Sequence, residues 1–93
     1  MTNIYPLTII IDRYGGVYSK GIWTAWNTKP QQIPEEVSDD DVTCSCWWQN
    51  YSTGKIQENK NEFGEIIYVG KGNTPEEAVE DLEQNIKKIA LLL

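Results

Sequence analysis

The segment from Gly70 to Ala78 constrains the fold most strongly, because an apolar stretch ends there and is followed by nearly every signal of a helix start. Thr74 is a favourable N-cap residue, Pro75 suits the first helical position, and Glu77 can complete a capping box three residues after the cap. Apolar residues then recur at spacings of three and four: Ala78, Val79, Leu82, Ile86, Ile89, Ala90 and Leu93. The pattern predicts an amphipathic helix from Pro75 that lies across one face of a sheet.

Before this helix, strands are predicted over residues 5–12, 22–26, 42–51 and 65–69. The first segment is rich in β-branched residues and the third alternates polar and apolar residues, and both features are typical of strands. Gly15 and Gly16 permit a reversal between the first two, which predicts an antiparallel hairpin with a long connection. We therefore expect an α+β fold, in a single domain of residues 1–93, with a four-stranded, mainly antiparallel sheet and one C-terminal helix packed on one face.

The strand predicted over 42–51 also determines where its side chains point, because neighbouring residues of a strand face opposite sides of the sheet. If Cys44, Cys46 and Trp48 face the helix, Trp47 lies on the open face. Both cysteines are then expected to be buried free thiols, since a disulfide between residues two apart on one strand would be strained. Residues 27–41 are predicted to form an acidic surface loop, and residues 52–64 a mobile hairpin loop.

The charge of the chain excludes some classes of function. It has 14 acidic and 8 basic residues among 93, for a formal net charge of −6, and the basic residues are scattered. Nucleic-acid binding draws on clustered Lys and Arg, so we expect no direct nucleic-acid contact and a basic protein as the partner. No stretch approaches the roughly 20 apolar residues of a membrane span, and the N-terminus lacks a secretion signal. We therefore expect a soluble, cytoplasmic protein without membrane association.

The residue types that carry chemistry argue against catalysis. Histidine is absent, which removes the commonest general base and the commonest metal ligand. Cys44 and Cys46 alone do not make a zinc site, and the consecutive aspartates at 39–41 lack the spacing of a calcium loop. Paired carboxylates such as Glu35 and Asp39 fall on a predicted loop with no positioned partner. We expect a non-enzymatic protein with no catalytic residue, no cofactor and no metal.

Two groups of residues are candidates for binding a partner. The first is acidic and could mimic nucleic-acid phosphates or dock in a basic groove, or simply form a solvated loop that aids solubility: Glu35, Glu36, Asp39, Asp40 and Asp41. The second consists of Trp23 and Trp47, because exposed tryptophans are frequent anchors of interfaces. The alternative for the tryptophans is that most of them form the core, where aromatic side chains dominate burial.

Two segments resemble the HicB-like antitoxin domain, in which a Gly-Asp-Thr-x-Glu-Glu-Ala stretch starts the helix. The matching residues are Gly15, Gly16, Val17 and Tyr18, and then Gly70, Gly72, Asn73, Thr74, Glu76, Glu77 and Ala78. The resemblance implies a small antiparallel sheet backed by a helix, and a non-enzymatic role in binding and blocking a small basic ribonuclease toxin. This chain departs from the family between the two motifs, where residues 19–69 replace a short link and contain all four tryptophans.

Two functional hypotheses follow. In the first, the chain is a small acidic inhibitor or antitoxin-like protein, encoded by a phage or mobile element, that covers the basic surface of a nucleic-acid-acting protein such as a nuclease. In the second, it binds or sequesters a nucleotide or another planar small molecule, which stacks on Trp23 or Trp47 in an aromatic pocket. The terminal residues 91–93 extend the apolar helix face beyond what one sheet covers, so this end either frays or is buried in a homodimer.

Overall fold

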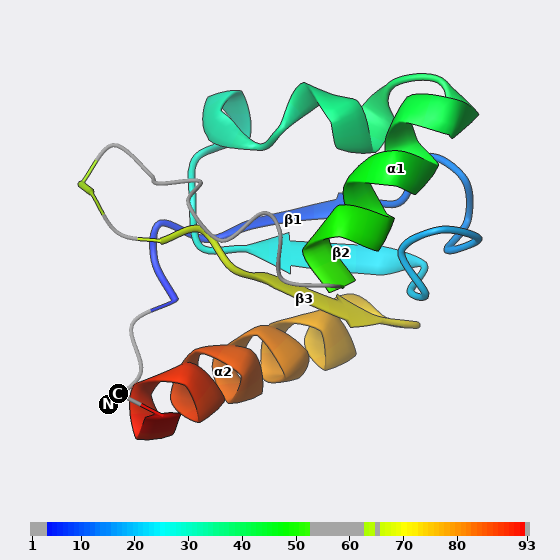
Figure 1. Cartoon of the computed structure of the whole chain (residues 1–93). Helices are drawn as coiled ribbons and strands as arrows, with labels where there is room; N and C mark the ends of the chain where they lie inside the picture. Colours follow the sequence, from blue (N-terminus) through cyan, green and yellow to red (C-terminus); the bar gives the residue numbers. More distant parts are fainter. Residues whose placement is uncertain (1–3, 53–62, 65, 93) are drawn as a thin grey trace.

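The chain has an α+β fold in the computed structural model, which describes residues 4–52, 63–64 and 66–92. The elements, in chain order, are β1 (Thr8–Ile11), β2 (Trp23–Trp26), the 3-10 helices η1 (Pro30–Gln32) and η2 (Glu35–Ser38), α1 (Asp41–Ser52), β3 (Val69–Gly72) and α2 (Pro75–Leu92). The strands form one antiparallel sheet in the order β1-β2-β3, with α1, η1 and η2 on one face and α2 on the other (Figure 1). The predicted α+β class, antiparallel sheet and C-terminal helix are confirmed.

The prediction of a strand over 42–51, which would have made a fourth strand, is wrong, because these residues belong to the helix α1. The segment fits both periods, since its buried and partly buried side chains also recur at helical spacings of three and four: Cys44, Trp47, Trp48 and Tyr51. Asp40 supplies the start signal, because its Oδ1 accepts a hydrogen bond from the Thr43 amide at 2.9 Å, which is the geometry of an N-cap. Among the described residues the sheet therefore has three strands, and helices cover both of its faces.

The first two predicted strands are present with shorter bounds, whereas the strand predicted over 65–69 shares only Val69 with the observed β3. β1 and β2 form the expected antiparallel pair, with Thr8 opposite Trp26 and Ile11 opposite Trp23. The last strand begins at Val69, later than predicted, because the side chain of Asn27 binds the backbone just before it. The Asn27 amide nitrogen donates to the Ile66 carbonyl at 3.0 Å, and its oxygen accepts from the Tyr68 amide at 2.6 Å. Most of the loop predicted over 52–64 lies outside the described residues.

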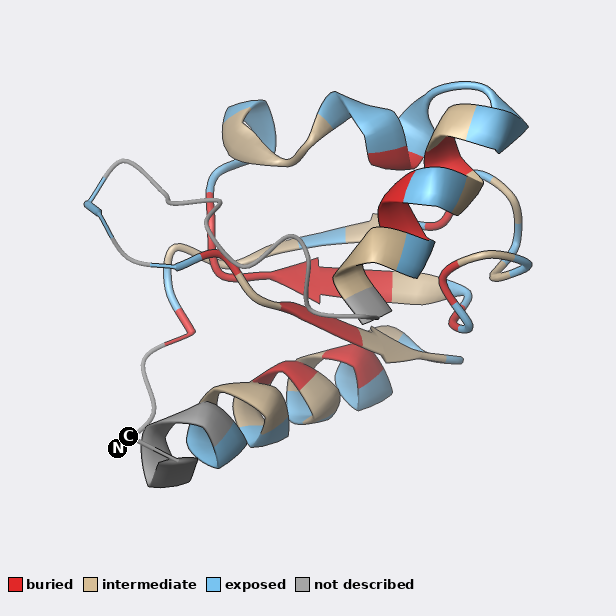
Figure 2. Cartoon of the chain, in the orientation of Figure 1, coloured by how far each residue is buried: buried red, intermediate tan, exposed pale blue. Residues whose placement is uncertain are grey.

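The sheet separates two apolar clusters, because alternate residues of β2 face opposite sides. Trp26 joins the cluster under α1, with Val37, Cys44, Trp47, Trp48, Ile67 and Val69. Ala25 joins the cluster under α2, with Ile4, Ala78 and Leu82. Figure 2 shows the buried residues concentrated on β2 and on the sides of both helices that face the sheet.

Close contact between β3 and α2 depends on two glycines. A Cβ atom placed on Gly70 would lie 2.2 Å from both the Ala78 oxygen and the Leu82 nitrogen, and one on Gly72 would lie 2.5 Å from the Glu77 Cβ. Side chains at these positions would push the helix away from the strand. The glycines that precede the helix thus serve packing, and Ala78 and Leu82 become fully buried.

The predicted start of α2 is confirmed. The Thr74 hydroxyl accepts a hydrogen bond from the Glu77 amide at 3.1 Å, and the Glu77 carboxylate accepts one from the Asn73 amide at 3.0 Å. These contacts satisfy amides that a helix start otherwise leaves without partners. No helix in the described part of the chain is long and apolar enough to span a membrane.

Candidate partner-binding surface

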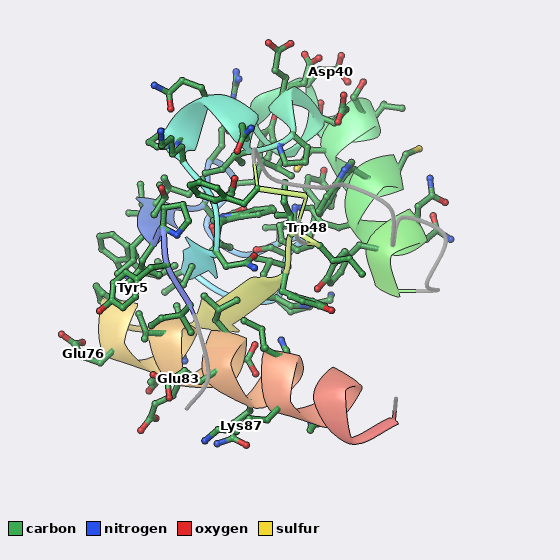
Figure 3. All side chains as sticks on the ribbon, turned by 90° about the vertical axis from the view of Figure 1, so that its left-hand side faces the viewer. Tyr5, Asp40, Trp48, Glu76, Glu83 and Lys87 are labelled. Atoms are coloured by element: carbon green, nitrogen blue, oxygen red, sulfur yellow. The ribbon has the colours of Figure 1, made fainter. Side chains whose placement is uncertain are left out.

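Five exposed carboxylates gather where η2 meets the start of α1. We call this surface the acidic ridge and define it by Glu35, Glu36, Asp39, Asp40 and Asp41. Figure 3 shows Asp40 at the end of the molecule farthest from α2, with its side chain directed outward. The sequence predicted an acidic stretch at the surface, and the structure adds that two short helices shape it.

The acidic ridge is attached to the rest of the fold by its backbone. Val37, in the middle of η2, is buried in the cluster under α1, and its carbonyl accepts a bond from the Cys44 thiol at 3.3 Å. Arg13 donates from its guanidinium to the Ser38 carbonyl, and the Tyr14 hydroxyl donates to the Asp39 carbonyl. The backbone of the ridge is therefore held in one shape while its carboxylates face outward, which lowers the ordering cost of binding.

Arg13 and Tyr14 are the residues of this site that the sequence analysis missed. They follow β1 and lie 25 positions before their partners in the chain, so no local pattern links them to the ridge. The Arg13 guanidinium also lies 5.5 Å from the centroid of the Tyr14 ring, within range of a cation–π contact. Arg13 brings one positive charge to an otherwise acidic surface.

Two aspartates of the ridge also have structural roles. Asp40 caps α1, as described above, and the Asp39 Oδ1 accepts a hydrogen bond from the Asp40 amide at 2.8 Å. The hydrogen bond from the Thr43 backbone, together with weaker contributions, lowers the pKa of the Asp40 carboxyl below its ordinary value. Reversing the charge of Asp39, Asp40 and Asp41 together would thus disturb the start of α1 as well as the surface. Glu35 and Glu36 are better positions for testing binding.

Asp40→Ala is expected to lower the melting temperature by a few degrees near neutral pH, because the first turn of α1 loses its cap. Asp40→Asn is the matched control, since asparagine also caps helices. A depressed pKa in the folded state means that the contribution of Asp40 is present above about pH 4 and is lost as the pH falls. Thermal melts from pH 7 to pH 3 should show the difference between native chain and Asp40→Ala shrinking, and a constant difference would contradict the role of the carboxylate.

Trp47 does not lie on an open face, contrary to the sequence prediction. It is 6% exposed and belongs to a cluster of aromatic residues between α1 and the sheet that also contains Trp26, Trp48 and Tyr51. Its ring stacks on Tyr51, with centroids 5.4 Å apart and an interplanar angle of 10°. In Figure 3 the neighbouring Trp48 points from α1 into the interior. Tyr51 covers one face of the Trp47 ring, and the burial of Trp47 leaves too little of the ring exposed for a planar ligand to stack on it.

Trp23 lies on the opposite side of the sheet from Trp47 and from the acidic ridge. It is half-buried and packs against the cluster under α2, which consists of Ile4, Ala25, Ala78 and Leu82. The structure therefore keeps the acidic candidates together but does not bring either candidate tryptophan into their surface. The acidic ridge is the candidate site that remains.

The two cysteines have different surroundings because positions two apart on a helix point in different directions. Cys44 is fully buried, and burial raises the pKa of its thiol. Cys46 is exposed, so the prediction of a buried thiol is confirmed for Cys44 and wrong for Cys46, and both are free. Among the described residues, no group of three or more His, Cys, Asp or Glu side chains is placed to hold a metal ion.

Comparison with known proteins returns no relative for this architecture: no protein-family model, no curated protein and no solved structure matches the chain.

Proposed function

We propose that this protein is a small acidic inhibitor that binds the basic surface of a nucleic-acid-acting protein such as a nuclease. The observation that carries the proposal is the acidic ridge, in which five of the seven residues from 35 to 41 are exposed carboxylates on a well-supported backbone. A surface that binds nucleic acid is basic because it must attract phosphates, so a dense set of carboxylates is complementary to it.

Three further features support this role. The net charge of −6 favours fast, salt-sensitive association with a basic protein. Several contacts, those of Val37, Arg13 and Tyr14, hold the backbone of the ridge before binding. The HicB-like resemblance implies the same kind of partner. Gly70, Gly72 and Thr74 of that motif have structural roles in this chain, so the acidic ridge supports the proposed function more strongly than the motif does.

Glu35→Lys combined with Glu36→Lys is expected to weaken partner binding at least about tenfold at low ionic strength, because two attractive charges become repulsive. These side chains are exposed and do not cap α1, so the fold should be retained. The matched control is Glu80→Lys with Glu83→Lys, which makes the same change in net charge on α2, the helix on the other face of the sheet (Figure 1).

The measurement is capture from bacterial lysate by the immobilised native chain and the two variants, with low- and high-salt washes and identification by mass spectrometry. The proposal predicts a basic nucleic-acid-acting protein that the native chain and the α2 control retain and the ridge variant loses. Equal retention by all three chains would remove the ridge from the mechanism. A captured nucleotide in place of a protein would favour the small-molecule hypothesis.

A further inference from the structure

The two edges of the sheet differ in whether side chains bind their outward-facing backbone groups. At the β3 edge, the outward-facing backbone groups have side-chain partners from α2: the Lys71 amide donates to the Asp81 carboxylate at 2.9 Å, and the Val69 carbonyl accepts from Asn85 at 2.9 Å. These two side chains occupy groups that another strand would need. The β3 edge is thus closed to further pairing.

β1 forms the other edge, where no described side chain binds the outward-facing backbone groups of Ile9 and Ile11. Within the described residues it pairs only with β2, and its sequence, Thr-Ile-Ile-Ile, contains no charge and no proline. Just beyond β1, the Asp12 amide donates to the carbonyl of Ile22, the residue before β2, at 2.7 Å. Backbone groups alternate in direction along a strand, so those of Ile9 and Ile11 point away from β2. The side chains of Ile9 and Ile11 are 36% and 60% exposed, because α2 covers mainly β2 and β3.

We propose that β1 pairs with β1 of a second copy of this chain in an antiparallel arrangement about a two-fold axis. The strand is self-complementary: when Ile10 meets its own counterpart at the axis, Ile9 lies opposite Ile11 of the second copy and Ile11 lies opposite Ile9. Both of these are then hydrogen-bonded pairs, each with two backbone bonds. The exposed isoleucines of the two copies form one apolar row on the α2 side of the joined sheet.

A second copy of the chain is the favoured partner for β1, because pairing between two identical edges leaves no β1 edge unpaired. Among the described residues, each protomer offers one free edge, so pairing of identical edges uses both and leaves the closed β3 edges outside. The product is a closed dimer whose two three-stranded sheets join into one of six strands, and not an open fibre. The axis is perpendicular to the sheet, so both acidic ridges face the same side.

The dimer and the proposed inhibitor complex respond to salt in opposite directions. Two chains with a net charge of −6 repel each other, and the paired strands contain no charged residue, so added salt should strengthen the dimer. Added salt should weaken binding of a basic partner to the acidic ridge. The dimer uses β1 and the inhibitor complex uses the acidic ridge, so either can form without the other.

Light scattering coupled to size-exclusion chromatography tests the pairing. We expect the native chain to have the mass of a dimer. Ile9→Lys with Ile11→Lys should have the mass of a monomer, because lysines would lie opposite each other across the axis. Ile9→Lys with Ile11→Glu should again have the mass of a dimer, because opposite charges would meet. A native chain that stays monomeric up to submillimolar concentration overturns the proposal, as does a dimer that survives the double lysine substitution. If β1 pairs only with a strand of another protein, the native chain alone stays monomeric, and this result also overturns the proposal.

Crosslinking gives a second readout that does not depend on the folding of the charged variants. In a Cys46→Ser background, Ile10→Cys should form a disulfide-linked dimer on mild oxidation, because non-hydrogen-bonded partners at the axis are within disulfide range. Ile9→Cys in the same background should not, since that position lies opposite Ile11 and not opposite itself. Equal crosslinking at both positions, or none at Ile10→Cys, would contradict the register.

Discussion

Gly70→Ala is expected to destabilise the protein by about 3 kcal/mol or more, a large part of the stability of a small domain. The added methyl group would lie 2.2 Å from the Ala78 oxygen and the Leu82 nitrogen, and both atoms belong to the backbone of α2. Backbone atoms within a helix cannot rotate away as a flexible side chain can. The whole helix must therefore move from β3, which breaks the packing of the cluster beneath it.

Chemical denaturation followed by circular dichroism measures this loss. Gly15→Ala is the matched control, because it adds the same methyl group at a position with nothing within 4 Å. Gly15 has a positive φ of 64°, so its substitution should cost only about 1–2 kcal/mol through backbone strain. If the two substitutions had equal effects, the close approach of β3 and α2 would be contradicted.

Trp26→Ala should lower the free energy of unfolding by about 3–5 kcal/mol, because it empties the centre of the aromatic cluster. Trp26 is 1% exposed, and its ring centroid lies 5.8 Å from that of Trp47 and 6.0 Å from that of Trp48. Its indole nitrogen also donates to the Thr24 hydroxyl at 2.9 Å. The substitution thus removes aromatic packing and leaves a buried hydroxyl without this donor.

Trp23→Ala provides the comparison for Trp26, since it is the same chemical change on the same strand at a half-buried position on the other face. Denaturant titration of both variants should show the larger loss for Trp26→Ala. A larger loss for Trp23→Ala would contradict the placement of the aromatic cluster under α1. Trp26→Phe should lie between the native chain and Trp26→Ala, because it keeps part of the ring packing.

The helix α2 was predictable because its signals are local. Thr74, Pro75 and Glu77 lie within four consecutive residues, and the periodicity that follows has a single interpretation. The helix α1 was not predictable in the same way, because residues 42–51 fit both the strand period and the helix period, and its cap residue Asp40 lies in a run of three aspartates that is also typical of a loop. What decides between them is distant in the chain: Trp26 and Val69 supply the apolar surface on which the helical face of Trp47 and Trp48 packs.

Because α1 was predicted as a strand, the sequence placed the acidic residues of the candidate site correctly but not Trp47. The acidic residues are exposed because charged side chains avoid the interior whether the backbone is a loop or a helix. The placement of Trp47 depended on strand alternation, so it was wrong when the strand became a helix. The contacts of Arg13 and Tyr14 with the ridge required the tertiary fold, which no local pattern encodes.

The most direct test of the proposed function is to titrate the basic protein captured from lysate with this chain while following its action on nucleic acid. We expect activity to fall as the chain approaches a one-to-one ratio at low salt. The variant Glu80→Lys with Glu83→Lys should inhibit equally, and Glu35→Lys with Glu36→Lys should require at least about tenfold more protein. Undiminished activity in the presence of saturating native chain would contradict the account.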